Sequence, residues 1–429
     1  MSSDSETINM TNERTLTPEL RFPEFRDGEG WQTLQLSDLY AFKRSNTLSR
    51  NKLNYDSGTI RNIHYGDIHT KFQPLFRVNH EYVPFINPEV SVNVFKDKDD
   101  CEVGDIVLAD ASEDVNDVGK AIEVVSLDGQ RVVAGTHTIL ATRHGSVPVV
   151  GFGGHLFQSA VVRAGIQRES QGAKVYGISA NRISPVALPL PPTNQEQQKI
   201  AECLSSLDGL IAAEGQKLTA LRHHKRGLMQ QLFPQPGQTE PHLRFPAFQG
   251  APGWDAKSVE QVCKILNNRR VPITSGDRTA GLYPYYGASG IVDYVDDFIF
   301  DERLVLVGED GAKWKAFEPT AFIAEGKYWV NNHAHVLKPT GLIDTLLANY
   351  LTLLDVGGYV TGAAPPKLTL QKLKTIPIPV PPSDEEQQLI ADCLTALDTR
   401  ITAQAKNIDA LKQHKRGLMQ HLFPAPEVS

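Results

Sequence analysis

The sequence predicts an α+β protein in which two α/β modules are joined by two long antiparallel coiled-coil helices with pseudo-two-fold symmetry. Three observations predict this class. Residues 188–234 recur without a gap as residues 378–424. Both copies carry the apolar spacing of a long helix. The segments between them, about 31–187 and 254–377, show little similarity to each other.

A second, shorter repeat precedes each module. Leu20-Arg-Phe-Pro23 recurs as Leu243-Arg-Phe-Pro246, and Trp31 recurs as Trp254. Internal repeats of this quality do not arise by chance. A duplication without functional meaning is the weaker alternative, because only the connecting parts stayed alike while the modules diverged. The plan suits two readers of different targets that are held by a common frame.

Each copy of the long repeat begins with a helix-start signal and ends at Phe-Pro, where proline stops a helix. Thr193 or Ser383 follows Pro-Pro as the cap residue, and Glu196 or Glu386 completes a capping-box pattern. Apolar residues then alternate in steps of four and three, which is the spacing of a coiled-coil seam. The predicted seam residues are Ile200, Leu204, Leu207, Ile211, Leu218, Leu221, Leu228, Leu232, Ile390, Leu394, Leu397, Ile401, Ile408, Leu411, Leu418 and Leu422.

The connections along the chain favour an antiparallel pair of helices. A parallel pair would require module two to stretch about 60 Å between its own ends. The two modules are therefore expected at opposite ends of the helical spacer. The polar seam positions predict Glu214 opposite Lys415 and Lys225 opposite Gln404. A register shifted by one heptad would set Glu214 against Ile408 and leave its charge unpaired, which is costly.

Local patterns indicate that each module is mixed α/β. Short β-rich runs such as 105–109 and 304–307 alternate with turns marked by Gly, Asn and Pro, and Gly341 to Leu354 is predicted to form a helix. The predicted boundaries are 1–17 for a disordered tail, 18–190 for module one, 191–235 for the first spacer helix, 236–253 for a linker, 254–380 for module two, 381–425 for the second spacer helix and 426–429 for a tail.

Composition excludes some classes of protein. No run of about 18 apolar residues exists and the N-terminal residues lack the apolar core of a signal peptide, so a cytoplasmic protein is expected. The net charge of −7 argues against tight binding of nucleic acid by this chain alone. A reader of base edges inside a larger complex can, however, leave part of the phosphate contacts to partner chains.

The chain resembles the specificity subunits of type I restriction–modification enzymes. The resemblance rests on paired variable modules and on duplicated helices that open with Pro-Pro and Glu-Gln-Gln, and it covers nearly the whole chain apart from the first 17 or so residues. Further matching pieces are Gly172-Ala-Lys…Ile183-Ser and Gly362-Ala-Ala…Leu373-Lys before each helix, and the segments 60–71, 286–290 and 331–335 within the modules.

This resemblance implies that each module is a target-recognition domain for one half of a bipartite, asymmetric DNA target. The helices would set the spacing of the half-sites and dock two adenine-methyltransferase subunits. Motor–nuclease subunits would join the complex for cleavage. The resemblance implies no catalytic site, metal or cofactor in this chain; S-adenosylmethionine, ATP and magnesium are expected on the partner subunits.

Candidate DNA-binding residues are those whose side chains suit base edges or phosphates. Arg and Lys suit guanine, whereas Asn and Gln suit adenine. Any one of them alone is more often a turn or surface residue. The candidates in module one are Arg61, His64, Tyr65, Asp67, His69, Lys71 and Lys174. Those in module two are Tyr286, Ser289, Asp310, Lys313, Asn331, Asn332, His333 and Lys367.

Enzymatic functions find weaker support in the sequence. It contains no Gly-x4-Gly-Lys-Ser/Thr loop and no Asn-Pro-Pro-Tyr or Asp-Pro-Pro-Tyr run for a flipped adenine. The alternative is a self-contained DNA nuclease with a metal site at Asp310, Glu325 and Lys327, a pattern that is short and common by chance. His333 and His335 lack a nearby third ligand, so loop histidines are the simpler interpretation.

Overall fold

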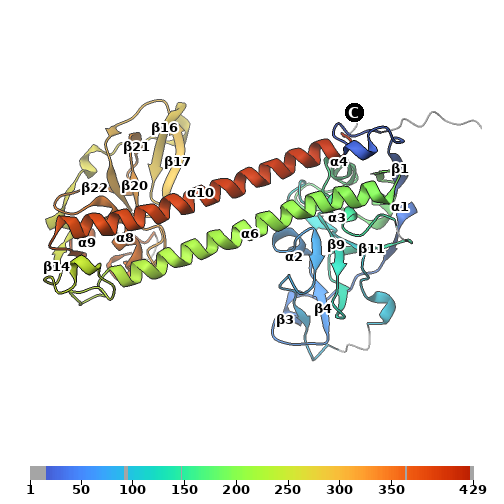
Figure 1. Ribbon diagram of the computed structural model, residues 1–429, viewed down its shortest axis with the longest axis horizontal. Helices are drawn as coiled ribbons and strands as arrows, with labels where there is room; N and C mark the ends of the chain where they lie inside the picture. The colour runs from blue at the N-terminus through green and yellow to red at the C-terminus, as the bar shows by residue number, and fades with distance from the viewer. Residues whose placement is uncertain (1–15, 91–94, 146, 363–364, 426–429) are drawn as a thin grey trace, which may run out of the picture. The chain divides into compact units, whose positions relative to one another are not determined.

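A computed structural model describes residues 16–90, 95–145, 147–362 and 365–425, so most of the first predicted tail and all of the second lie outside the described residues. The chain forms two compact units (Figure 1). Unit 1 comprises Met1–Ala213 and Asp409–Ser429, and unit 2 comprises Glu214–Ile408. Each unit therefore contains one module and a segment of each long helix.

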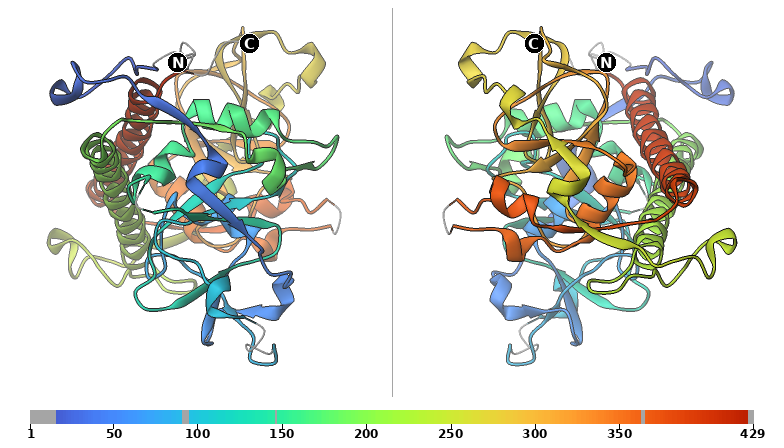
Figure 2. Two further views of the ribbon diagram at one scale, coloured as in Figure 1. Left: turned by 90° about the vertical axis from the view of Figure 1, so that its right-hand side faces the viewer. Right: turned by 90° about the vertical axis from the view of Figure 1, so that its left-hand side faces the viewer.

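Module one, which faces the viewer in the left view of Figure 2, is built around a five-stranded sheet that is buried on both faces. On β7, Ile106 and Leu108 contribute to one apolar core, whereas Val107 and Ala109 contribute to another. Burial on both faces explains why this strand is a continuous apolar run in the sequence. In sheet order the strands are β2 (Tyr40–Lys43), β11 (Thr138–Arg143), β7 (Ile106–Ala109), β9 (Ala121–Ser126) and β5 (Leu75–Arg77).

Smaller sheets and short helices complete module one. A four-stranded sheet has the order β10 (Arg131–Ala134), β4 (Ile60–Ile63), β6 (Phe85–Ile86) and β3 (Leu53–Asn54). Two antiparallel pairs join β1 (Gln32–Gln35) to β13 (Ala187–Leu190) and β8 (Ala111–Ser112) to β12 (Tyr176–Gly177). The helices of the module are α1 (Leu36–Leu39), α2 (Tyr65–Thr70), α3 (Phe152–Leu156), α4 (Ala160–Arg168) and α5 (Ala180–Ile183).

Module two, which faces the viewer in the right view of Figure 2, repeats the central part of this plan with different residues. On β19, Val305 and Val307 belong to one core, and Leu304 and Leu306 belong to another. Its main sheet has the order β15 (Cys263–Ile265), β22 (Ala334–Pro339), β19 (Leu304–Gly308) and β20 (Ala321–Ala324). A second sheet contains β17 (Gly290–Val295), β16 (Ala280–Gly287), β21 (Lys327–Val330) and β18 (Phe300–Asp301), and β14 (Asp255–Ser258) pairs with β23 (Pro377–Val380). The helices of the module are α7 (Val259–Val262), α8 (Asp344–Leu353) and α9 (Leu370–Lys374).

The two long helices are α6 (Asn194–Leu232) and α10 (Asp384–Leu422). In unit 1, Leu204 from the start of α6 shares a core with Leu422 from the end of α10. In unit 2, Leu232 from the end of α6 shares a core with Ile390 from the start of α10. All sixteen predicted seam residues are buried or partly buried. The two helices are therefore antiparallel, which confirms the predicted fold class.

The predicted register of the helices is wrong. Lys415 binds Asp208 at 2.6 Å instead of Glu214, and Lys225 binds Asp398 at 2.6 Å instead of Gln404. Glu214 instead accepts hydrogen bonds from Gln404. The prediction failed because a glutamate is long enough to reach a polar partner one turn away from Ile408. The observed register is close to the alternative that is shifted by one heptad. In this register Glu214 is nevertheless paired, because Gln404 donates to it.

The contacts of the long helices repeat as the sequence does. Lys415 and Asp398 are the repeat equivalents of Lys225 and Asp208, and Glu214 and Gln404 are equivalents of each other. The same lysine and aspartate positions therefore pair in each unit, with the roles of α6 and α10 exchanged. This exchange is the expected mark of pseudo-two-fold symmetry in the helix pair.

The capping-box prediction is half right. The Thr193 hydroxyl accepts the backbone N–H of Glu196 at 3.2 Å, and Ser383 caps α10 in the same way. The carboxylate of Glu196, however, does not return to the cap residue. It is buried and forms a bidentate pair with Arg21 of the short repeat, at 2.7 Å to both oxygens. Glu386 binds Arg244 in the same way. In each unit the short repeat therefore supplies the arginine and the long repeat supplies the glutamate of one ion pair.

None of the helices within the described ranges combines the length and the apolar character needed to cross a membrane.

Candidate nucleic-acid interface

Each module has a corner where two neighbouring strands of its main sheet meet the loop that leads toward a long helix. In module one, Asp110 follows β7 and its backbone N–H donates to His137, which precedes β11. The carbonyl of Asp110 in turn accepts the N–H of Ile178. In module two, Glu309, His333 and Leu368 make the same two backbone bonds. We call these two places the strand-end corners.

The loop of each corner is a common element of both modules. Gln171 and Gly177 form a β-bridge in module one, and their repeat equivalents Thr361 and Lys367 form one in module two. The gapless repeat thus extends upstream of the helices to these loops. Gly172 has a φ of 138°, and a Cβ there would lie 1.8 Å from the Val175 carbonyl oxygen, so only glycine fits.

Several predicted residues gather at the corner of module one. The ring of Tyr65 stacks on His64 at 4.8 Å and lies edge-on to His137 at 5.3 Å. His69 shares a hydrogen bond of 3.0 Å with the carbonyl of Ala111 on β8, the strand that pairs with the loop segment β12. His137 was not predicted. Its partner Asp110 is 27 residues away, and the available signal was a histidine directly before an apolar strand, as at His333.

Asp67 and Lys71 support this corner from within. Asp67 is fully buried and pairs with Arg50 at 2.6 Å and with Lys71 at 2.9 Å. Burial raises the pKa of the Asp67 carboxyl, but the hydrogen bonds from Arg50 and Lys71 outweigh this and hold the pKa below its usual value. For His64, which caps α2, burial and the nearby Arg50 charge lower the pKa. Asp67 thus holds α2 in place.

The two remaining candidates of module one lie in different settings. Arg61 donates to the Val83 carbonyl at 2.6 Å and to Gln130, and its guanidinium lies 4.0 Å above the ring of Phe85. Two of its guanidinium nitrogens, Nε and Nη1, therefore donate inside the module. Lys174 is exposed in the loop of the corner, between Gln171 and Gly177.

The corner of module two is a network of charged groups. Asp310 pairs with the Nδ1 of His333, and Lys367 lies 3.4 Å from Asp310 and 3.1 Å from Glu309. Burial raises the pKa of the Asp310 carboxyl, but hydrogen bonding to His333 and Lys367 outweighs it, so the net pKa is lowered. Asn331 is buried, and its side chain accepts the backbone N–H of His333 at 2.8 Å. This network contains four of the predicted residues, Asp310, Asn331, His333 and Lys367, and also Glu309, which was missed.

Two further residues of this network were not predicted to bind DNA. Arg270 donates to Glu309 at 2.7 Å and to the carbonyl of Asn332 at 3.2 Å. His335 is fully buried beside Glu309, and burial lowers the pKa of its imidazole. Its Nε2 shares a hydrogen bond of 2.7 Å with the Leu368 carbonyl. Both residues thus stabilise the corner through hydrogen bonds to its side chains and backbone carbonyls.

The side chains of the other candidates of module two have different surroundings, although the backbone carbonyl of Tyr286 accepts the N–H of Asn331 at 3.1 Å. Tyr286 packs its partly buried ring against Phe322 at 5.6 Å and Tyr328 at 5.5 Å, so it belongs to a core. Ser289 is exposed in the turn between β16 and β17. Lys313 is exposed and lies 3.7 Å from Glu318.

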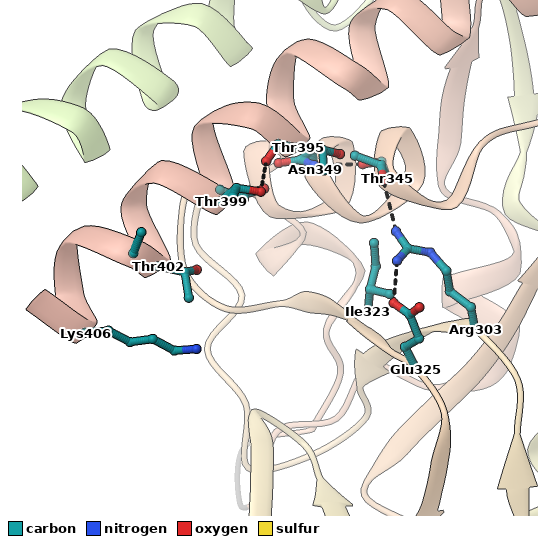
Figure 3. Close-up of a pocket in the computed structure, with 11 residues that line it drawn as sticks. Arg303, Ile323, Glu325, Thr345, Asn349, Thr395, Thr399, Thr402 and Lys406 are labelled. Carbon is teal, nitrogen blue, oxygen red and sulfur yellow. Dashed lines mark hydrogen bonds and ion pairs between the residues drawn. The ribbon is translucent and has the colours of Figure 1, made fainter.

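The residues of the nuclease alternative are engaged with different partners. Asp310 pairs with His333, Lys327 lies 4.6 Å from the ring of Phe298, and Glu325 binds Arg303 at 2.7 Å. Figure 3 shows Glu325 and Arg303 pointing toward each other in an open pocket of about 550 Å³ that threonines of α10 also line. In the part of the chain that the structure describes, no group of three or more His, Cys, Asp and Glu residues is placed to hold a metal ion.

Comparisons with known proteins agree with this architecture. The model of the type I restriction modification DNA specificity domain matches twice, at residues 28–223 and 252–413. A Haemophilus influenzae protein, named provisionally as type I restriction enzyme specificity subunit S.HindORF215P, is 39% identical over 33% of this chain and 37% of its own length. The MjaX specificity subunit of Methanocaldococcus jannaschii, also named provisionally, is 24% identical over 57% of this chain and 60% of its own length. The chain thus spans less than two thirds of either relative.

Solved structures show the same fold. The S subunit of a type I restriction-modification system from M. genitalium has a TM-score of 0.61 at 14% identity and covers 96% of this chain and 100% of its own. A chain from a study of complex assembly and conformational transition in the type I R-M system has a TM-score of 0.53 at 16% identity, over 95% of this chain and 100% of its own. With the family model matching well over half of its residues, the chain belongs to the type I restriction–modification specificity subunits.

Proposed function

We propose that this chain selects the DNA target of a type I restriction–modification complex and that each module reads one half of a bipartite, asymmetric sequence. One observation carries the proposal: two modules with unlike sequences build the same strand-end corner from the same backbone bonds, yet place different side chains beside the histidine–aspartate pair of each corner, Tyr65 in module one and Lys367 in module two. A shared scaffold with unlike linings is what two readers of different half-sites need, because base edges are distinguished by their patterns of donors and acceptors.

The long helices would set the distance between the half-sites and dock two adenine-methyltransferase subunits. The chain itself would be non-catalytic. S-adenosylmethionine, ATP and magnesium would bind to the partner methyltransferase and motor–nuclease subunits. The net charge of −7 fits a chain that leaves part of the phosphate contacts to those partners.

Methylome sequencing tests the proposal. Cells that express this chain with its methyltransferase partner are expected to carry methylated adenine in one bipartite motif. Exchanging residues 31–187 for the module of another family member should change one half of that motif and leave the other half and the methyltransferase partner unchanged. Absence of a bipartite motif, or a change of both halves in the exchange, would contradict the proposal.

A further inference from the structure

Each strand-end corner exposes an imidazole that is held by a carboxylate. In module one the Nδ1 of His137 lies 3.2 Å from Asp110, and the side chain of His137 is 59% exposed. In module two the Nδ1 of His333 pairs with Asp310, and the side chain of His333 is 52% exposed. Each carboxylate is less exposed than the ring that it holds. The rings therefore face solvent while their carboxylates are anchored in the module.

The two modules reach this arrangement with different residues. By its backbone hydrogen bonds, the equivalent of Asp110 is Glu309. Glu309, however, pairs with Arg270 and Lys367, and the next residue, Asp310, binds the imidazole. The residue at the position equivalent to Asp110 is therefore not the one that binds the histidine in module two. The carboxylate that holds the ring comes from Asp110 in module one and from Asp310, one position later, in module two.

A carboxylate at Nδ1 determines what the rest of the ring can do. In the neutral ring the carboxylate accepts the Nδ1–H bond, and this selects the tautomer in which Nε2 carries no proton. The exposed Nε2 is then a hydrogen-bond acceptor. In the major groove its partners are the exocyclic amino groups, N6 of adenine and N4 of cytosine. A hydrogen-bond acceptor on the protein therefore favours a base with an amino group, adenine or cytosine, over thymine or guanine at the same position.

We propose that His137 and His333 are specificity-determining residues, one in each half-site, and that Asp110 and Asp310 position them to accept a hydrogen bond from an amino group of adenine or cytosine. This inference rests on the proposed function of the chain. The neighbours of the rings suit contact with DNA. Tyr65 offers an aromatic edge beside His137, and Lys367 offers a cation beside Asp310.

The test is methylome sequencing of variants expressed with the methyltransferase partner and without the motor–nuclease subunit, so that relaxed targets are not cut. His137 has a φ of 54°, so His137→Gly removes the side chain without straining the backbone, whereas His333→Ala is suitable in module two. In each variant the ratio of methylation at the preferred base pair to methylation at the other base pairs should fall about five- to tenfold at one position of its own half-site, as expected for the loss of one hydrogen bond.

The positioning role has its own readout. In Asp110→Asn, the amide can bond either tautomer of His137, so the acceptor is no longer enforced. The same base pair should then lose part of its preference, while the preferences at the other base pairs of the target and the thermal stability stay at the wild-type level. Asp310→Asn should act in the same way on the other half-site. His80→Ala, which alters an exposed histidine in the turn after β5, is the matched control and should change nothing.

The outcomes separate this inference from the proposed function. If the wild-type chain yields no bipartite motif, the proposed function fails. If it yields one and both histidine variants retain every base preference, only the inference about His137 and His333 fails. A histidine variant that changes the half-site of the other module, or that lowers methylation equally at all sequences, would also overturn the inference.

Discussion

Replacing Arg21 with alanine should detach the start of α6 from the short repeat in unit 1. The Arg21 side chain is 6% exposed and that of Glu196 is 1% exposed. The guanidinium donates two charge-assisted hydrogen bonds to the carboxylate, and others to the carbonyls of Gly28 and Glu29. In Arg21→Ala the carboxylate of Glu196 would keep the hydrogen bond from Trp31 Nε1 at 3.2 Å.

The expected loss of stability follows from this geometry. Removing one partner of a buried ion pair costs about 3–5 kcal/mol, because the other charge stays buried. The double variant Arg21→Met with Glu196→Met removes both charges and should cost less. It still leaves the Trp31 indole N–H without its acceptor, which costs about 1–3 kcal/mol. The single variant is therefore expected to be less stable than the double variant.

Native-state hydrogen exchange is the suitable assay, because it reports the free energy of local opening for each segment separately. Peptides from residues 16–31 and from the first turns of α6 should lose protection in Arg21→Ala. Peptides from the equivalent attachment in unit 2, where Arg244 binds Glu386, serve as the internal control. A loss below about 1 kcal/mol in Arg21→Ala, or equal losses in the single and double variants, would refute the reasoning.

Three further predictions concern the long helices, His155 and the activity of the whole chain. Lys225→Met and Lys415→Met should each cost only about 0.5 kcal/mol in urea unfolding, because Asp398 and Asp208 are partly exposed; a loss beyond about 2 kcal/mol in either would count against this. Burial lowers the pKa of His155 to about 3, so this histidine is neutral in the folded chain and charged in the unfolded chain below about pH 6.5. Stability should therefore fall by up to about 1.4 kcal/mol per pH unit from about pH 6.5 toward pH 3, and His155→Asn should flatten that dependence in acid titrations followed by circular dichroism. Finally, the purified chain with S-adenosylmethionine, magnesium and DNA should neither methylate nor cleave; adenine methylation or cutting by the chain alone would contradict the non-catalytic role.

The fold was accessible from the sequence where local pattern and repetition decide it. The seam spacing marks both long helices, and the Pro-Pro start and Phe-Pro end mark their limits. The register was not accessible, because it depends on how far Glu214 and the two lysines reach along the partner helix. The destination of Glu196 was hidden for a similar reason, since its partner Arg21 is 175 residues away.

The candidate sites were predicted in part. Segments such as residues 65–71 and 331–333 do lie at the strand-end corners. Arg61 and Tyr286 were chosen for their chemical type, yet both are used inside their modules. Sequence patterns could not reveal this, because strands buried on both faces lack the alternation that identifies an outward side. His137 was missed because only the fold brings it to Asp110.

The amide side chain next to each attachment glutamate has a consequence for how these proteins can diversify. Gln197 accepts the backbone N–H of Val149 at 2.9 Å, and Gln387 accepts that of Ile343 at 3.0 Å. Every residue except proline offers this N–H group. At these two points each long helix holds its module through a backbone N–H group, which is present whatever the side chain. Substitutions on the surface of a module can therefore change its side chains and leave these two hydrogen bonds in place.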